Sequence, residues 1–143
     1  MKKYDIKNIN EAGRMVIEQL QSQDFDVRTS VWINDHRNIL FTAERNLAVF
    51  SFFLKYDRNP YYAGARELEP EKRFKGPAVC INKLVYETYI EPMDAEILYC
   101  IPENIYHISI DNFIGAGVEH RQKSNQEDVI MVPLTEFKAW LAE

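Results

Sequence analysis

Residues 39–54, ILFTAERNLAVFSFFL, carry the pattern that decides the fold of this chain. Two apolar runs, at residues 39–42 and 47–54, flank the short segment 43–46, which is the pattern of a β-hairpin. The second run is almost continuously apolar, and such runs are typical of strands that are buried on both faces. We therefore expect the second arm of this hairpin to be the central strand of a β-sheet.

The segments on either side of the hairpin add further elements. Apolar residues at helical spacing predict a helix over residues 10–23, and the alternation at 25–33 predicts a strand. After the hairpin, residues 57–76 are polar and rich in Pro and Gly, which indicates a long loop. Residues 79–89 then approximate an amphipathic helix that Pro92 ends.

The last third of the chain contains a second hairpin and a terminal helix in this interpretation. Residues 95–101 and 105–110 bracket a Pro-Glu-Asn turn, and residues 129–132 form a short strand. A terminal helix is expected to start at Pro133 and to dock through Phe137, Trp140 and Leu141. The order of elements predicts an α/β fold with a central mixed β-sheet flanked by helices, in a single domain spanning residues 1–143.

The composition favours a globular protein and excludes several classes. Hydrophobic residues make up 46% and aromatic residues 13% of the chain, which is enough to form a core. The longest apolar run is far shorter than the ~20 residues that cross a bilayer, and no signal peptide follows the first lysines, so we expect a cytoplasmic protein without a membrane partner. The formal net charge of −5 disfavours nonspecific nucleic-acid binding over the whole surface but leaves room for a local basic patch.

The order helix, three strands, helix, strand over residues 10–110 resembles the core of the restriction-endonuclease-like, or PD-(D/E)XK, nucleases. In that family, a carboxylate near the second strand and a Glu-x-Lys or Asp-x-Lys on the third hold a divalent metal, and the lysine helps to orient the attacking water. Lys55 matches that lysine here, while Phe53 occupies the acidic position. The upstream carboxylate would be Asp35, but the arm that should hold it reads Asn-Ile-Leu at residues 38–40.

Two hypotheses follow for the residues around Lys55. In the first, the chain is an active metal-dependent nuclease that uses Mg²⁺, with Lys55, Asp57 and either Asp35 or Glu87 as relocated catalytic residues. In the second, Lys55 is a strand-end lysine whose charge lies in water while its stem covers apolar surface, and the chain needs no cofactor. The second interpretation is simpler, and we favour it.

Other catalytic and metal-binding patterns are weak. Cys80 and Cys100 lie in apolar surroundings and lack the spacing of a zinc knuckle, which predicts reduced, buried thiols. Cys100 and His107 would lie near each other across the second hairpin, but no third ligand has a recognisable spacing, so no metal site is expected.

The long loop combines basic and aromatic residues that can contact phosphates and stack on bases, namely Arg58, Arg66, Lys72, Arg73 and Lys75 with Tyr61 and Tyr62. Tyrosine and arginine are also enriched in protein interfaces. The leading hypothesis is therefore a non-catalytic or impaired endonuclease-like domain that binds nucleic acid or a protein partner through this loop. The alternatives are the active nuclease and a structural protein whose aromatic surface forms a homodimer.

Overall fold

The computed structural model describes residues 4–33, 37–60, 76–122 and 125–141. The elements are, in chain order, α1 (Ile9–Ser22), β1 (Asp26–Ile33), β2 (Asn38–Arg45), β3 (Ala48–Tyr56), β4 (Ala78–Asn82), α3 (Lys83–Val85), the π-helical turn η2 (Tyr86–Ile90), β5 (Glu96–Ile101), β6 (Asn104–Ile108), α4 (Ile110–Ala116), β7 (Val118–Arg121), β8 (Asp128–Pro133), the 3₁₀ turn η3 (Leu134–Glu136) and β9 (Lys138–Ala139).

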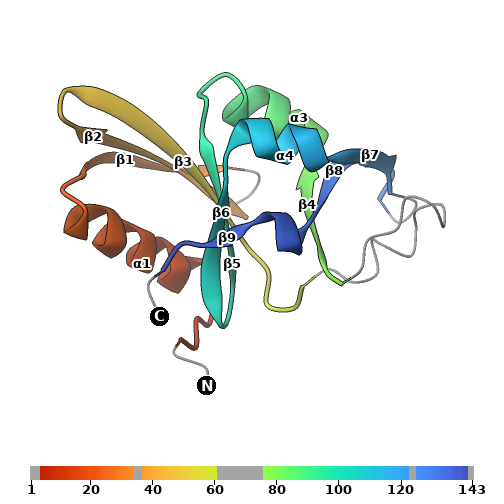
Figure 1. Ribbon diagram of the computed structural model, residues 1–143, viewed down its shortest axis with the longest axis horizontal. Coiled ribbons are helices and arrows are strands. Elements are labelled where there is room, and N and C mark those ends of the chain that lie inside the picture. The colour runs from red at the N-terminus through yellow and green to blue at the C-terminus, as the bar shows by residue number, and fades with distance from the viewer. Residues whose placement is uncertain (1–3, 34–36, 61–75, 123–124, 142–143) are drawn as a thin grey trace.

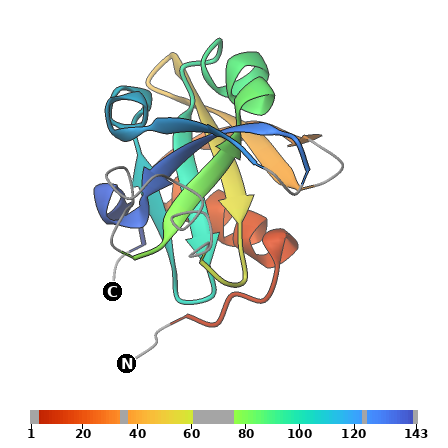
Figure 2. The same cartoon turned by 90° about the vertical axis from the view of Figure 1, so that its right-hand side faces the viewer.

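The strands form two sheets, which Figures 1 and 2 show from two directions. The large sheet has the order β1-β2-β3-β5-β6-β9, and the small sheet has the order β4-β8-β7. In the large sheet β3 pairs with β5 in parallel, while the other neighbours pair antiparallel. The expected α/β fold with a central mixed sheet and helices is confirmed at this level.

Helix α1 covers one face of the large sheet. Asn8 begins the helix, because its side chain accepts a hydrogen bond from the backbone N–H of Glu11 at 2.9 Å. Gly13 lets the helix come close to β2, since a Cβ placed there would lie 2.9 Å from the Cδ1 of Ile39. The apolar stripe of α1 thereby packs with Phe41, Phe52 and Leu54 in one buried cluster.

The small sheet and α4 cover the opposite face of the large sheet. Phe53 on β3 and Tyr99 on β5 are buried there, together with Val79 of β4 and Val132 of β8. Strand β5 alternates between the two clusters, so it is buried on both faces along nearly its whole length. Residues 47–54 were expected to have this property, but in β3 burial is confined to residues 51–54, and β3 pairs with β5 only from Phe52 onward.

One expected helix is only partly correct, and another is wrong. Residues 79–89 begin as β4, which pairs with β8 and of whose five residues the first four are buried, so that a helix with a polar face would not fit. Only after Asn82 does the chain turn into α3 and η2. The C-terminal segment forms η3 and β9 in place of a helix. Its residues Phe137 and Leu141 are buried in different clusters, on opposite faces of the large sheet, whereas residues four apart on a helix share a face.

Candidate binding pocket

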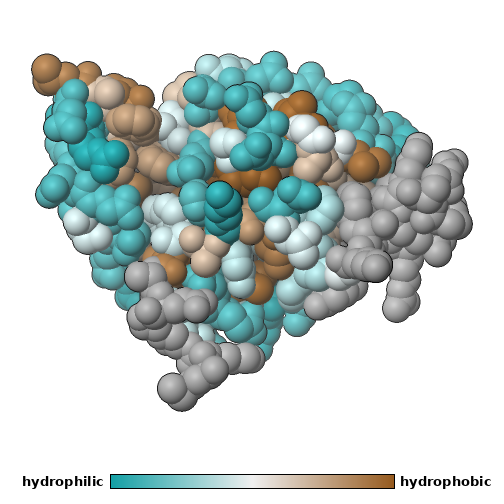
Figure 3. Space-filling model, in the orientation of Figure 1, coloured by the Kyte–Doolittle hydropathy of each residue, from teal (hydrophilic) through white to brown (hydrophobic). Residues whose placement is uncertain are grey.

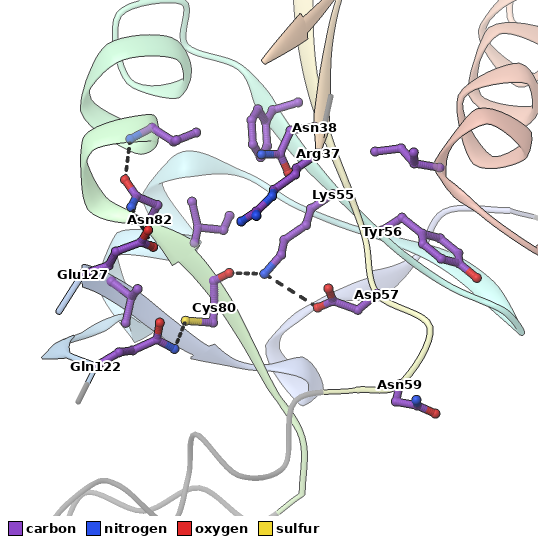
Figure 4. Close-up of a pocket in the computed structure, with 15 residues that line it drawn as sticks. Arg37, Asn38, Lys55, Tyr56, Asp57, Asn59, Cys80, Asn82, Gln122 and Glu127 are labelled. Atoms are coloured by element: carbon purple, nitrogen blue, oxygen red, sulfur yellow. Dashed lines mark hydrogen bonds and ion pairs between the residues drawn. The ribbon is translucent and has the colours of Figure 1, made fainter. Parts of the chain in front are cut away.

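A pocket of about 500 Å³ lies where the end of β3 meets the outer edge of β4 (Figure 4). Its polar walls come from four separate parts of the chain, namely Arg37 and Asn38, then Lys55, Asp57 and Asn59, then Asn82, then Gln122 and Glu127. Apolar side chains, including Phe53 and Val129, form the remaining lining. A pocket of this size can enclose a small organic ligand or a nucleotide.

Lys55 connects the two sheets at this pocket. Its position on β3 lies opposite Asn38 of β2, and its Nζ donates a hydrogen bond to the backbone carbonyl of Cys80 on β4. The same ammonium group lies 3.6 Å from Oδ2 of Asp57. The expectation that the charge of Lys55 lies in water is therefore wrong, because the side chain is only 21% exposed and its ammonium group contacts the protein. Since β4 is the outer strand of the small sheet, Lys55 occupies a carbonyl group that strand pairing within that sheet does not use.

Strand β5 of the large sheet holds Asp57 in place. The hydroxyl of Tyr99 donates to Oδ2 of Asp57 at 2.8 Å, and the backbone N–H of Asp57 donates to the carbonyl of Cys100 at 2.9 Å. Tyr99 is fully buried, and this burial, together with the negative charge of Asp57, raises the pKa of its hydroxyl far above the ordinary value. Tyr99 therefore remains a hydrogen-bond donor, and Asp57 is held in one orientation.

The opposite wall consists of amide side chains that are themselves held in place. Asn82 accepts a hydrogen bond from the backbone N–H of Val85 at 3.0 Å and donates to Oε2 of Glu127 at 3.2 Å. Gln122 is buried, and its Nε2 lies 3.5 Å from Sγ of Cys80, while its Oε1 accepts from Asn125 at 3.1 Å. These contacts orient the amide groups before any ligand enters.

Arg37 adds a second cation, beside Lys55, to the described lining of the pocket. Figure 4 shows its guanidinium group pointing into the space between Lys55 and Asn82. Within the described ranges, no carboxylate forms an ion pair with Arg37, whereas Lys55 already contacts Asp57. The pocket thus offers one exposed guanidinium group and several oriented amides to a ligand.

The structure brings together some of the residues that sequence reasoning singled out. Lys55 and Asp57 line the pocket, but Glu87 lies exposed on η2 and does not line it. Arg58 is exposed just beyond Asp57 and is not part of the lining. Seven candidates cannot be placed because they lie outside the described residues, namely Asp35, Tyr61, Tyr62, Arg66, Lys72, Arg73 and Lys75.

Sequence reasoning missed the pocket wall formed by Asn82, Gln122 and Glu127. Asn82 gives a local signal, since it caps the short helix α3, but Gln122 and Glu127 belong to the connection between β7 and β8. They reach the pocket only because β8 pairs with β4, a contact between segments far apart in sequence. No local sequence pattern predicts the pairing of β4 with β8.

The remaining candidate ligands do not converge. Both cysteines are free and buried, as expected, and burial raises the pKa of the Cys100 thiol to about 12. His107 pairs with Glu96 at 3.1 Å. Among the described residues, no three side chains of His, Cys, Asp or Glu lie close enough together to hold a metal ion.

Comparison with known proteins assigns no family to the chain, since no family model, curated protein or solved structure matches it. None of the described helices is long and apolar enough to cross a membrane. The inference of function therefore depends on the geometry of the pocket.

Proposed function

We propose that this chain is a non-catalytic nucleic-acid-binding domain and that the pocket between its two sheets receives one unpaired nucleotide. The observation that carries the proposal is the combination of an exposed Arg37, which pairs with no carboxylate among the described residues, with amide side chains that are already oriented by the protein. Arginine binds phosphate through its planar guanidinium group. Amide side chains offer a donor and an acceptor together, which is the combination that base edges require.

The architecture supports the proposal of a restriction-endonuclease-like core. Three antiparallel strands, β1 to β3, precede a parallel neighbour, β5, and α1 lies against them. The connection from β3 to β5 departs from a simple helical crossover, because it passes through β4 before α3 and η2. In this proposal the fold was retained while the metal-binding motif was lost, with Phe53 buried where a carboxylate would stand.

The carboxylates of the pocket support a non-catalytic function. Asp57 accepts a hydrogen bond from Tyr99 and contacts Lys55, and Glu127 accepts a hydrogen bond from Asn82. A metal ion would have to compete with these donors for the same oxygen atoms. Asp57 therefore orients the pocket in our proposal rather than holding a catalytic metal.

Each of the two alternative functions is supported by one specific observation. The adjacency of Lys55 and Asp57 favours the metal-dependent nuclease, in which Mg²⁺ would recruit Asp57 and a second carboxylate such as Glu127. Hydrophobic atoms at the tip of the β2–β3 hairpin, at the upper left of Figure 3, favour a protein partner. The exposed side chains there are Leu47, Val49 and Phe50.

Fluorescence anisotropy with short labelled single-stranded DNA and RNA tests the binding proposal. Arg37→Gln should weaken binding several-fold and reduce the slope of log K against log salt by about 0.7, as the loss of one phosphate contact implies. Joint replacement of Arg66, Arg73 and Lys75 should reduce that slope by roughly 2 if all three residues contact phosphates. The matched control is Arg28→Gln, because Arg28 is also exposed but pairs with Glu44 on β1 and β2, outside the pocket.

Binding that is undetectable at low salt, or that is equally lost in the Arg28 control, would contradict the proposal and favour the hypothesis of a protein partner.

Incubation of supercoiled plasmid, linear duplex and single-stranded RNA with Mg²⁺ or Mn²⁺ tests the nuclease hypothesis. No cleavage is expected. Cleavage by the wild-type protein that Lys55→Ala abolishes would show that relocated ligands exist.

A further inference from the structure

Strand β1 forms the outer edge of the large sheet and has few of the features that protect such an edge. Residues 29–33 read Thr-Ser-Val-Trp-Ile and contain neither a charge nor a proline, the residues that usually protect edge strands. Arg28 lies just before them, but its guanidinium group is drawn toward Asp26 at 3.3 Å and Glu44 at 3.2 Å. The other end of the same sheet is β9, which has two residues and offers little edge.

Both faces of β1 expose apolar side chains beside this edge. Val31 is 51% exposed, and it lies opposite Leu40, on the face of the sheet away from α1. Trp32 is 39% exposed and lies on the α1 side, where it lines a groove with Ser30 and Ile17. Aromatic side chains at the surface are enriched in protein interfaces.

The flank of α1 that borders this groove is self-complementary in charge. Arg14 and Glu18 are four residues apart, so they lie on one side of the helix; both are exposed and both line the groove beside β1. A two-fold axis near Val31 would place the two copies of α1 side by side and antiparallel. Arg14 would then face Glu18 of the partner subunit, and a two-fold interface requires such self-complementarity.

We propose that the chain forms a two-fold symmetric dimer in which β1 pairs antiparallel with β1 of a second copy, centred on Val31. The two large sheets join into one, and Trp32 is covered between the two α1 helices. The proposal does not depend on the proposed function, because none of the residues that carry it lines the binding pocket.

Sedimentation equilibrium of the full chain, up to about 100 μM, tests the dimer. We expect a reversible dimer for the wild type and a monomer for Val31→Lys, because a lysine on an edge strand disfavours pairing with another strand. The matched control is Leu84→Lys, since Leu84 is also an exposed apolar residue but lies on α3. Circular dichroism of each variant confirms that it is folded.

Charge reversal tests the arrangement of the helices. Arg14→Glu and Glu18→Arg should each raise the dissociation constant of the dimer at least about tenfold, because each places like charges opposite each other. The double variant, and an equimolar mixture of the two single variants, should recover the wild-type association. A wild type that remains monomeric, a dimer that survives Val31→Lys, or single reversals that leave association unchanged would each overturn the proposal.

Discussion

Replacement of Lys55 by methionine removes the ammonium group that joins β3 to the edge of β4 and keeps most of the apolar stem. In the wild type, this group donates to the carbonyl of Cys80 and lies 3.6 Å from Asp57. The side chain of Lys55 is only 21% exposed, so water replaces these contacts incompletely in the variant. We expect Lys55→Met to lower the free energy of unfolding.

The size of the loss can be worked out from the two contacts. A hydrogen bond from a charged donor contributes about 1.5–3 kcal/mol, and a partly exposed ion pair adds at most about 1 kcal/mol. Two effects reduce the sum. Asp57 keeps its hydrogen bond from Tyr99 in the variant, and the variant no longer bears the free-energy cost of removing the ammonium group from water. A net loss of about 2 kcal/mol is therefore expected.

Urea unfolding followed by far-UV circular dichroism measures this loss. The urea concentration at the unfolding midpoint should fall. The slope of the unfolding free energy against urea concentration should stay the same, because the surface exposed on unfolding hardly changes. Lys83→Met is the control, since Lys83 also forms an ion pair, with Glu119 at 3.2 Å, but at the surface; its midpoint should not change. Equal midpoints for Lys55→Met and the wild type would show that Lys55 does not stabilise the junction of the sheets.

Two further predictions concern the hairpin turn and a buried thiol. Leu47 is 96% exposed and has a φ of 66°, so Leu47→Gly should raise the free energy of unfolding by about 0.5–1 kcal/mol, whereas Val49→Gly in the adjoining strand should lower it; a loss in both variants would contradict this. Burial raises the pKa of Cys100 to about 12, above its unfolded value near 9, so the stability that this proton provides is complete below about pH 9 and is lost as the pH rises toward 12. Urea unfolding between about pH 9 and 10.5 should show the wild type losing about 1.4 kcal/mol per pH unit more than Cys100→Ala, and parallel losses would refute the assigned cause.

The parts of the fold that the sequence predicts are those formed by local contacts. The sequence pattern correctly predicts the hairpin of β2 and β3, but it places the turn at residues 43–46, whereas β2 continues to Arg45 and the turn consists of Asn46 and Leu47, both with positive φ. Helix α1 is predicted by its apolar spacing, and its cap at Asn8 is likewise a local contact. The second hairpin, β5 with β6, has the same local character.

The errors arise where distant segments decide the conformation. Val79 and Ile81 suit either a strand or a helix by spacing alone, and pairing with β8 selects the strand. Phe137 and Leu141 suit one helical face, but the chain extends along β6 and buries them on opposite faces of the sheet. The candidate site follows the same rule, since Lys55 and Asp57 are close in sequence whereas Gln122 and Glu127 join them only through tertiary pairing.

The route from β3 to β5 constrains the order in which the chain can assemble during synthesis. Strand β4 lies between these two parallel neighbours in sequence, yet it pairs with β8, which is synthesised later. While the ribosome makes the intervening residues, β4 has no strand of its own sheet available, although the first hairpin and β5 can already pair. The small sheet closes over Phe53 and Tyr99 only after Asp128–Pro133 has emerged, so the junction that forms the pocket cannot be completed before β8 is synthesised.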